Sequence, residues 1–254
     1  MGADSAHGRA TWTVVGAWGR WPAPGGALRG HLARSGAGGA LLVGAGSGVV
    51  GRLGYHLESW AELSAVLLPD LAPEHISDLW ALGNATAAAV EAGKRRGLLT
   101  VLAPLEPIDA WRALGRPGVL DVRGLGPGDT MHCAGWRCTL FSEGEGQTVV
   151  RLEAAGATVG LVCAGTRPLV PAPLSAARLL IVELGPREGG GLGPAEAAQL
   201  AAGAAAETLL LCHRDPGDPV AEMLAEARAR FANTLLGLEG RTYDVPPAGD
   251  GPRL

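Results

Sequence analysis

The order of short apolar runs and helical stretches is the feature that most constrains the fold of this chain. In the first half, runs of strand-forming residues are bounded by Gly, Pro or Asp, which commonly mark the ends of strands. The strands predicted there are residues 11–15, 30–34, 40–43, 65–68 and 98–102. Helices are predicted at 61–63, 76–92 and 108–114, the second because Ile76, Leu79 and Leu82 follow helical spacing.

The second half repeats this order with strands and helices of its own. Its predicted strands are residues 119–123, 135–142, 148–154, 158–162, 179–184, 207–212 and 241–245, and its predicted helices are 194–203 and 219–231. Strands accompanied by helices in both halves indicate two sheets, each covered by helices. We therefore expect an α/β chain that forms a four-layer αββα sandwich, as a single domain over 1–254 with its core at about 11–245.

Composition and charge argue against several classes of protein. Of the 254 residues, 47% are hydrophobic and 18% are charged, so we expect a sizeable core rather than disorder. A net charge of −4 and a single lysine, Lys94, argue against a nucleic-acid partner. No apolar stretch reaches the ~20 residues of a membrane span, and the first residues lack the layout of a signal peptide. Four cysteines in a chain of this length do not resemble a disulfide framework, which favours the cytoplasm.

Three stretches, taken in order, carry a resemblance to one family. Residues 41–48 read LLVGAGSG, residues 65–79 read AVLLPDLAPEHISDL, and residues 209–213 read LLLCH. Together they resemble the strand-and-turn, metal-motif and closing segments of the metallo-β-lactamase fold superfamily, in its ribonuclease Z-like and arylsulfatase-like branch. The resemblance implies an αββα sandwich of that type, with a cleft at one edge of the two packed sheets.

The resemblance also implies a zinc site, because the family holds one or two zinc ions through an H-x-H-x-D-H signature and later ligands. In this chain Asp70, Ala72 and Glu74 stand where the signature has its first His, its second His and its Asp. His75 retains the last His of the signature, and His213 matches the closing His. Because a dinuclear centre needs more donors than these, we expect no dinuclear zinc and no cofactor. A single metal ion held by Asp70, Glu74, His75 and His213 is the alternative.

Without a metal, the same four residues predict an acid–base site. His75 and His213 would act as acid and base, since imidazoles titrate near neutral pH, and Asp70 and Glu74 would orient them. The alternative is that these four residues are an inert relic of a lost metal site.

A substrate-binding wall is predicted beside this group. The resemblance places the loop after the first strand at the rim of the cleft, where Trp18 and Trp21 would face a ring or acyl chain and Arg20 would bind a carboxylate. Trp80, one turn beyond His75, is expected to pack under the same cleft. Thr166 falls at or beside the position of the family's bridging Asp. The alternative is that the tryptophans only cap the core.

The four cysteines are expected to be buried and unreactive. Cys163 and Cys212 would border the family's cleft, which makes each a candidate nucleophile. Adjacent residues of a strand face opposite sides, however, so Cys212 should pack in the core if His213 faces the cleft. Cys133 and Cys138 lack the spacing of a zinc knuckle.

These observations predict an atypical enzyme of this fold that acts on a small organic substrate, acyl-, ester- or ring-containing, by acid–base chemistry. The resemblance makes hydrolysis the default, with lyase, cyclisation and isomerisation steps also open. The alternatives are a mononuclear-metal hydrolase and a non-catalytic protein that binds a ligand or partner. A homodimer is possible by resemblance to the ribonuclease Z-like branch. The Ala-, Gly-, Pro- and Arg-rich composition indicates a GC-rich genome and, by association only, a role in specialised metabolism.

Overall fold

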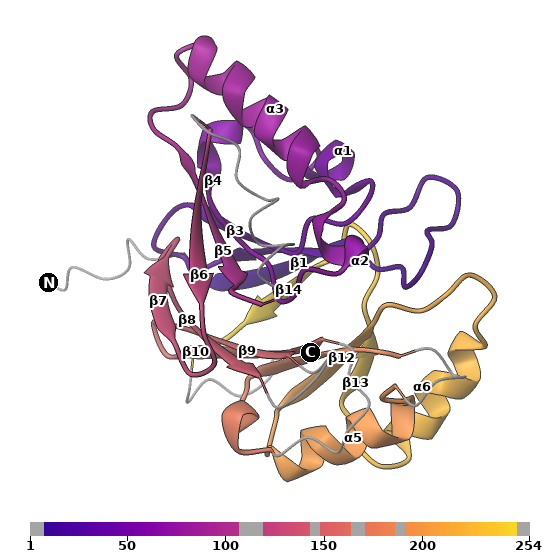
Figure 1. Ribbon diagram of the computed structural model, residues 1–254. Coiled ribbons are helices and arrows are strands. Elements are labelled where there is room, and N and C mark those ends of the chain that lie inside the picture. The colour runs from indigo at the N-terminus through magenta and orange to yellow at the C-terminus, as the bar shows by residue number, and fades with distance from the viewer. Residues whose placement is uncertain (1–7, 107–118, 143–147, 164–170, 186–190, 248–254) are drawn as a thin grey trace, which may run out of the picture.

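The computed structural model describes residues 8–106, 119–142, 148–163, 171–185 and 191–247, which form two mixed sheets of seven strands each (Figure 1). The first sheet has the strand order β14-β1-β2-β3-β4-β5-β6. Its strands are β1 (Ala10–Gly16), β2 (Gly30–Arg34), β3 (Ala40–Val43), β4 (Leu63–Leu67), β5 (Leu99–Pro104), β6 (Leu120–Leu125) and β14 (Thr242–Val245). The helices that belong with it are α1 (Val49–Leu53), η1 (Trp60–Glu62), α2 (Pro73–Ile76) and α3 (Leu79–Glu91).

The second sheet has the order β13-β12-β11-β10-β9-β8-β7. Its strands are β7 (Thr130–Cys133), β8 (Trp136–Ser142), β9 (Thr148–Ala154), β10 (Ala157–Cys163), β11 (Leu179–Glu183), β12 (Thr208–Cys212) and β13 (Thr234–Leu236). Its helices are η2 (Ala172–Leu174), α5 (Pro194–Gly203) and α6 (Val220–Arg228). Each half of the chain therefore supplies most of one sheet, and β14 returns to the first sheet beside β1.

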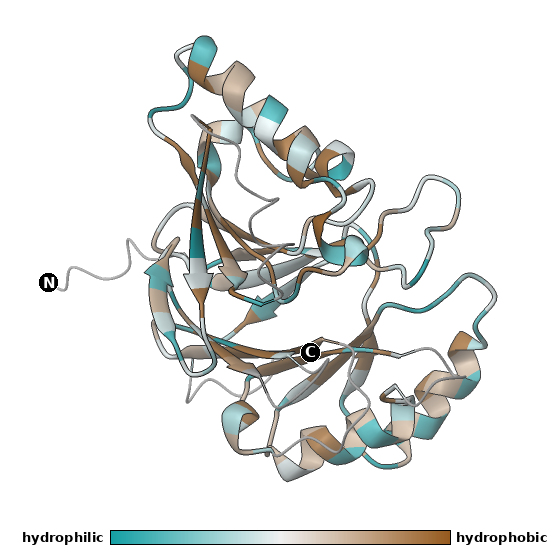
Figure 2. Cartoon of the chain, viewed as in Figure 1, coloured by the Kyte–Doolittle hydropathy of each residue, from teal (hydrophilic) through white to brown (hydrophobic). Residues whose placement is uncertain are grey.

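The two sheets pack face to face, and helices cover the outer face of each (Figure 1). Alternation along the strands produces these layers, because Leu41 and Val43 join the core between the sheets while Leu42 packs with the α1 and α3 side. A third apolar cluster joins the second sheet to α5 and α6. Figure 2 shows the strands mostly apolar and the outer helices carrying the polar residues. The predicted αββα sandwich is confirmed.

The topology brings several loops to one edge of the sandwich. Strands β3 to β6 run parallel, as do β10 to β13, so their carboxyl ends lie together within each sheet. The loop after β1 meets the loop after β12, since the N–H of His213 donates to the carbonyl of Ala17 at 3.0 Å and the N–H of Gly19 to that of Arg214 at 3.0 Å. This edge is where the chemistry-bearing residues gather.

Helix α1 and the short η2 were not predicted, and the structure differs from the predicted elements in further places. The helix predicted at 76–92 is divided into α2 and α3, because the N–H of Asp78 donates to the carbonyl of Ala45 and its carboxylate accepts from the N–H of Val50. Strands β7 and β13 were not predicted. The helix predicted at 108–114 lies outside the described residues. Among the described helices, none has the length and apolar character needed to cross a membrane.

Candidate active site

Glu183, the last residue of β11, is the centre of a buried group of charged side chains. Its carboxylate is 1% exposed and accepts a hydrogen bond from Nη1 of Arg29 at 3.0 Å. Nε2 of His75 lies 3.3 Å from it, and Nδ1 of His213 lies 3.1 Å from Oε1. Burial disfavours the charged form, but His213, His75 and Arg29 outweigh it and hold the pKa of Glu183 well below its ordinary value. Glu183 is therefore ionised.

His75 is held between two carboxylates. Its Nδ1 lies 2.7 Å from Oδ1 of Asp70, which also accepts a hydrogen bond from the N–H of Ala72 at 2.8 Å. Burial by itself would lower the pKa of His75, but Glu183 and Asp70 raise it to about 9. His75 is thus a cation at neutral pH, able to donate to Asp70 through one nitrogen and to Glu183 through the other.

His31 of β2 belongs to the same group, although no motif in the sequence indicated it. Nε1 of Trp12 donates a hydrogen bond to Nδ1 of His31 at 3.1 Å, so the neutral ring carries its proton on Nε2. The ring lies 5.5 Å from that of His213, between centroids. Burial, together with His213, lowers the pKa of His31 to about 3, and its Nε2 has no hydrogen-bond partner among the described residues.

His213 follows β12 directly and, together with Arg29, lines a cavity. Its φ of +61° is left-handed, a conformation uncommon for residues with a side chain and often found at functional sites. Burial lowers the pKa of His213 to about 4, which leaves the ring neutral at pH 7. Nδ1 is at ion-pair distance from Glu183 but is not aligned as a hydrogen bond, and Nε2 has no partner among the described residues.

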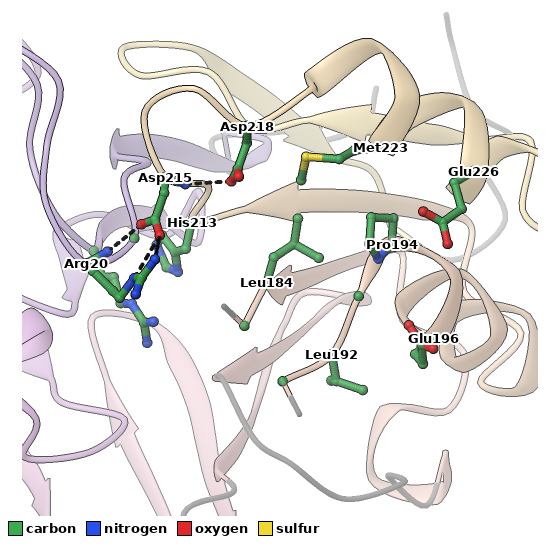
Figure 3. Close-up of a pocket in the computed structure, with 15 residues that line it drawn as sticks. Arg20, Leu184, Leu192, Pro194, Glu196, His213, Asp215, Asp218, Met223 and Glu226 are labelled. Carbon is green, nitrogen blue, oxygen red and sulfur yellow. Dashed lines mark hydrogen bonds and ion pairs between the residues drawn. The ribbon is translucent and has the colours of Figure 1, made fainter. Parts of the chain in front are cut away.

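The cavity beside His213 has a volume of about 770 Å³. At one end lie His213, Arg29 and Arg20, as Figure 3 shows for the first and last of these. Its middle is apolar, and its far end carries carboxylates of α5 and α6 (Figure 3). The apolar residues are Leu184, Leu192, Pro194 and Met223, and the far carboxylates are Glu196 and Glu226. A space of this size holds a small organic molecule.

The predicted substrate wall is only partly at this cavity. Arg20 lines it, but its guanidinium is bound to Asp215 through Nε and Nη2, at 2.8 and 2.7 Å from Oδ2. Trp18 donates from Nε1 to Glu239 at 3.1 Å and is covered by the guanidinium of Arg214, so it fixes the loop. Trp21 is largely exposed beside Arg20. Neither tryptophan is among the described residues that line the cavity.

Of three other predicted residues, two lie away from the cavity and the third lies outside the described residues. Trp80 does not pack under the cleft: it is 49% exposed, because Leu79 and Leu82 occupy the buried face of α3. Glu74 lies in the first turn of α2, partly exposed, and is not in the group around Glu183. Thr166 lies outside the described residues. Sequence reasoning therefore identified His75, His213 and Asp70 but missed Glu183, Arg29, His31 and Trp12.

The described cysteines are free thiols, and three of them are buried. Cys212 packs in the core between the sheets while His213 faces the cavity, as the alternation along the strand predicted. Cys163 is fully buried, and burial, with Glu183 and Asp70, raises its pKa well above its ordinary value. Cys133 is the exception, being partly exposed.

Comparison with known proteins gives the architecture a name. No protein-family model and no curated protein matches the chain. A solved structure of YhfI from Bacillus subtilis, a metallo-β-lactamase fold protein, matches it with a TM-score of 0.86 at 23% identity, over 93% of this chain and 100% of that one. The chain has the metallo-β-lactamase fold.

Two further structures with lower identity agree. Zn²⁺-bound PqqB from Methylobacterium extorquens matches with a TM-score of 0.71 at 15% identity, over 92% of this chain and 100% of that one. The short form of human tRNase Z matches with a TM-score of 0.70 at 15% identity, over 93% and 99%. The fold predicted from the sequence resemblance is confirmed.

The metallo-β-lactamase fold implies a metal centre. Whether this chain could hold one depends on which of its donor atoms lie close together. Among the residues that the structure describes, two groups of three donors have atoms within 4.8 Å of one another: His31, Glu183 and His213, and His75, Cys163 and Glu183. Glu183 is shared by both groups and is already the partner of Arg29. A metal ion in either group would share that carboxylate with a guanidinium.

The first group does not fit a metal ion. His31 would have to bind the metal ion through Nε2, but Nε2 carries the ring proton because Nδ1 accepts the hydrogen bond from Trp12. If that proton moved to Nδ1, the N–H groups of His31 and Trp12 would point at each other. In the second group Cys163 would have to ionise against a raised pKa. These residues therefore do not fit a two-metal centre. A single metal ion bound by His75, Cys163 and Glu183 is the alternative, and the metal content of the purified protein tests it.

Gly44 directly follows β3, and the structure explains why a side chain is excluded there. Its φ is +75°, and a Cβ there would lie 3.0 Å from the carbonyl of Arg29 and 3.2 Å from Cδ2 of His75. We expect Gly44→Ala to lower the free energy of unfolding by about 2–4 kcal/mol, from left-handed strain plus overpacking. Gly97→Ala is the matched control, since Gly97 has φ +79° and open space at its Cβ. If Gly44→Ala and Gly97→Ala lower the free energy of unfolding in urea equally, His75 does not need the space beside Gly44.

Proposed function

We propose that the chain is an enzyme that performs acid–base chemistry on a small organic substrate in this cavity, without a dinuclear metal centre. The observation that supports this most directly is His213, which is neutral and lines the cavity, with Glu183 beside its Nδ1. Its Nε2 is buried in this conformation, has no hydrogen-bond partner among the described residues, and would reach a substrate by a turn of the ring. A buried neutral imidazole backed by a carboxylate is the arrangement of a general base.

Each member of the group has a separate role in this proposal. His213 accepts a proton from the substrate at Nε2, and Glu183 stabilises the imidazolium that forms. Arg29 lines the same end of the cavity, so its remaining N–H groups can hold a substrate oxygen that becomes negative. His75 does not line the cavity and acts with Asp70 as a positioning residue that keeps Glu183 ionised. The acid–base pair expected from the sequence is therefore reduced to His213.

The shape of the cavity supports a substrate with an acyl chain or a ring, since its middle is apolar. Hydrolysis of an ester, lactone or thioester fits a base that activates water. Abstraction of a proton next to a carbonyl, leading to elimination, cyclisation or isomerisation, uses the same base and the same cation. A cytoplasmic role in specialised metabolism remains part of the proposal, supported by composition alone.

We expect His213→Gln to lower activity by about 100-fold, because a general base typically contributes that much or more. The measurement is turnover on a panel of esters, lactones and thioesters, together with solvent deuterium exchange next to a carbonyl. His132→Gln is the control, since His132 is exposed on β7.

The metal content of the same preparations distinguishes this proposal from a mononuclear hydrolase. We expect far less than one equivalent of metal, and activity that survives a chelator. One equivalent that is lost in Cys163→Ser would instead support a metal ion at His75, Cys163 and Glu183. Unchanged turnover in His213→Gln would remove the proposed base.

A further inference from the structure

Two thiols lie close together in the β7–β8 hairpin, far from the acid–base site in the fold. Sγ of Cys133 and Sγ of Cys138 are 3.5 Å apart. The hairpin pairs Met131 with Cys138 and Cys133 with Trp136, which puts the two cysteines on one face of the sheet as diagonal neighbours. Their side chains contact because of the strand register, although five positions separate them in the sequence.

The hairpin holds this spacing firmly. Ala134 and Gly135 form its two-residue turn with φ values of +49° and +76°, the signs expected of a tight turn that matches the strand twist. Oγ of Ser35, the residue that follows β2, donates a hydrogen bond to the carbonyl of Ala134 at 3.0 Å. The turn conformation and the hydrogen bond from Ser35 therefore hold the hairpin in place, and the distance between the two thiols follows from the fold.

The two thiols are not equivalent. Cys133 is partly exposed, whereas Cys138 is buried against the core between the sheets. The hydrogen bond between them lowers the pKa of Cys133 and raises that of Cys138. A partly exposed cysteine whose thiol pKa is lowered, next to a second thiol that can displace whatever becomes attached to it, is the arrangement of reversible redox pairs.

We propose that Cys133 and Cys138 form a reversible disulfide in exchange with a small-molecule disulfide of the glutathione type. Cys133 thiolate attacks one sulfur of glutathione disulfide, a mixed disulfide forms, and one glutathione thiolate leaves. Cys138 then gives up its proton and attacks Sγ of Cys133, which releases the second glutathione. Two protein thiols are oxidised and one glutathione disulfide is reduced to two thiols. The sulfurs must close from 3.5 Å to the ~2.05 Å of a bond, which for diagonal neighbours takes side-chain rotation together with a small movement of the edge strand β7.

The test exposes the folded full-length chain to glutathione disulfide at neutral pH, followed by acid quenching, alkylation and peptide mapping. We expect a peptide in which Cys133 is linked to Cys138, with Cys163 and Cys212 still reduced because both are buried. Dithiothreitol should restore all four thiols. A folded chain that keeps four reduced cysteines, or that forms its disulfide between two chains, would overturn the proposal.

Two variants test the order of the steps. Cys138→Ser should stop at a stable glutathione adduct on Cys133, because the resolving thiol is gone. Cys133→Ser should react at least about tenfold more slowly, since the remaining thiol is buried and its pKa is raised. An equal rate in Cys133→Ser, or an adduct on another cysteine in Cys138→Ser, contradicts the assignment. If either variant does not fold, the peptide map of the unaltered chain decides alone.

Discussion

Replacing Arg29 by Met is expected to lower the free energy of unfolding by about 3–5 kcal/mol, because the change removes the guanidinium that pairs with the buried carboxylate of Glu183. The side chain of Glu183 is 1% exposed and that of Arg29 is 10% exposed, so water cannot take the place of the guanidinium. Met fills much of the same volume without the charge. Urea unfolding at pH 7, with the slope checked for two-state behaviour, measures the loss.

The chain contains its own control for this prediction. Arg20 makes a shorter contact with Asp215, at 2.7 Å against 3.0 Å for Arg29 and Glu183, but its side chain is 57% exposed. Arg20→Met is therefore expected to cost no more than about 1 kcal/mol. Adding Glu183→Gln to Arg29→Met should recover part of the loss, since the uncompensated charge is then removed. If the two arginine variants are equally stable, Arg29 does not hold the charge of Glu183.

The layers of the fold could be predicted because they depend on local pattern. Strands at 30–34, 40–43 and 148–154 and the helix at 194–203 have the predicted bounds, and each follows a Gly or a polar residue that marks its start. β7 was missed because Thr130–Cys133 is a short, half-exposed strand whose alternation is no stronger than that of a loop. β13 has only three residues and is stabilised mainly by its pairing with β12.

The site was harder to predict because its central residue, Glu183, meets its partners only through contacts between distant parts of the sequence. Asp70 and His75 lie five residues apart, so the motif brought them to notice, whereas Glu183 is 108 residues from His75. A signal was present: Glu183 ends a strand that is otherwise wholly apolar, and a carboxylate there lies at the edge where loops meet. No comparable signal marks His31, whose role depends on the indole of Trp12 in the neighbouring strand.

The second large effect expected is on stability as a function of pH. The folded chain keeps His31 and His213 neutral, with pKa values of about 3 and 4, whereas in the unfolded chain both bind protons below the ordinary pKa of about 6.5. Stability should therefore fall as the pH falls from 6.5 towards 4, by up to about 2.7 kcal/mol per pH unit. The pKa of His75 is raised to about 9, so its contribution is complete below pH 6.5 and is lost as the pH rises to 9, by up to about 1.4 kcal/mol per unit.

Together these shifts predict a maximum of stability near pH 6.5, with an acid limb about twice as steep as the alkaline limb. Urea unfolding between pH 5 and 8.5 measures both limbs. His31→Gln should reduce the acid limb by about half, because Gln can still accept the hydrogen bond from Trp12 but does not titrate. His75→Gln should remove the alkaline limb, and His132→Gln, at an exposed position, should change neither. A flat profile from pH 5 to 6.5 would mean that His31 and His213 are open to water in solution, and a neutral base buried at the cavity would then have no support.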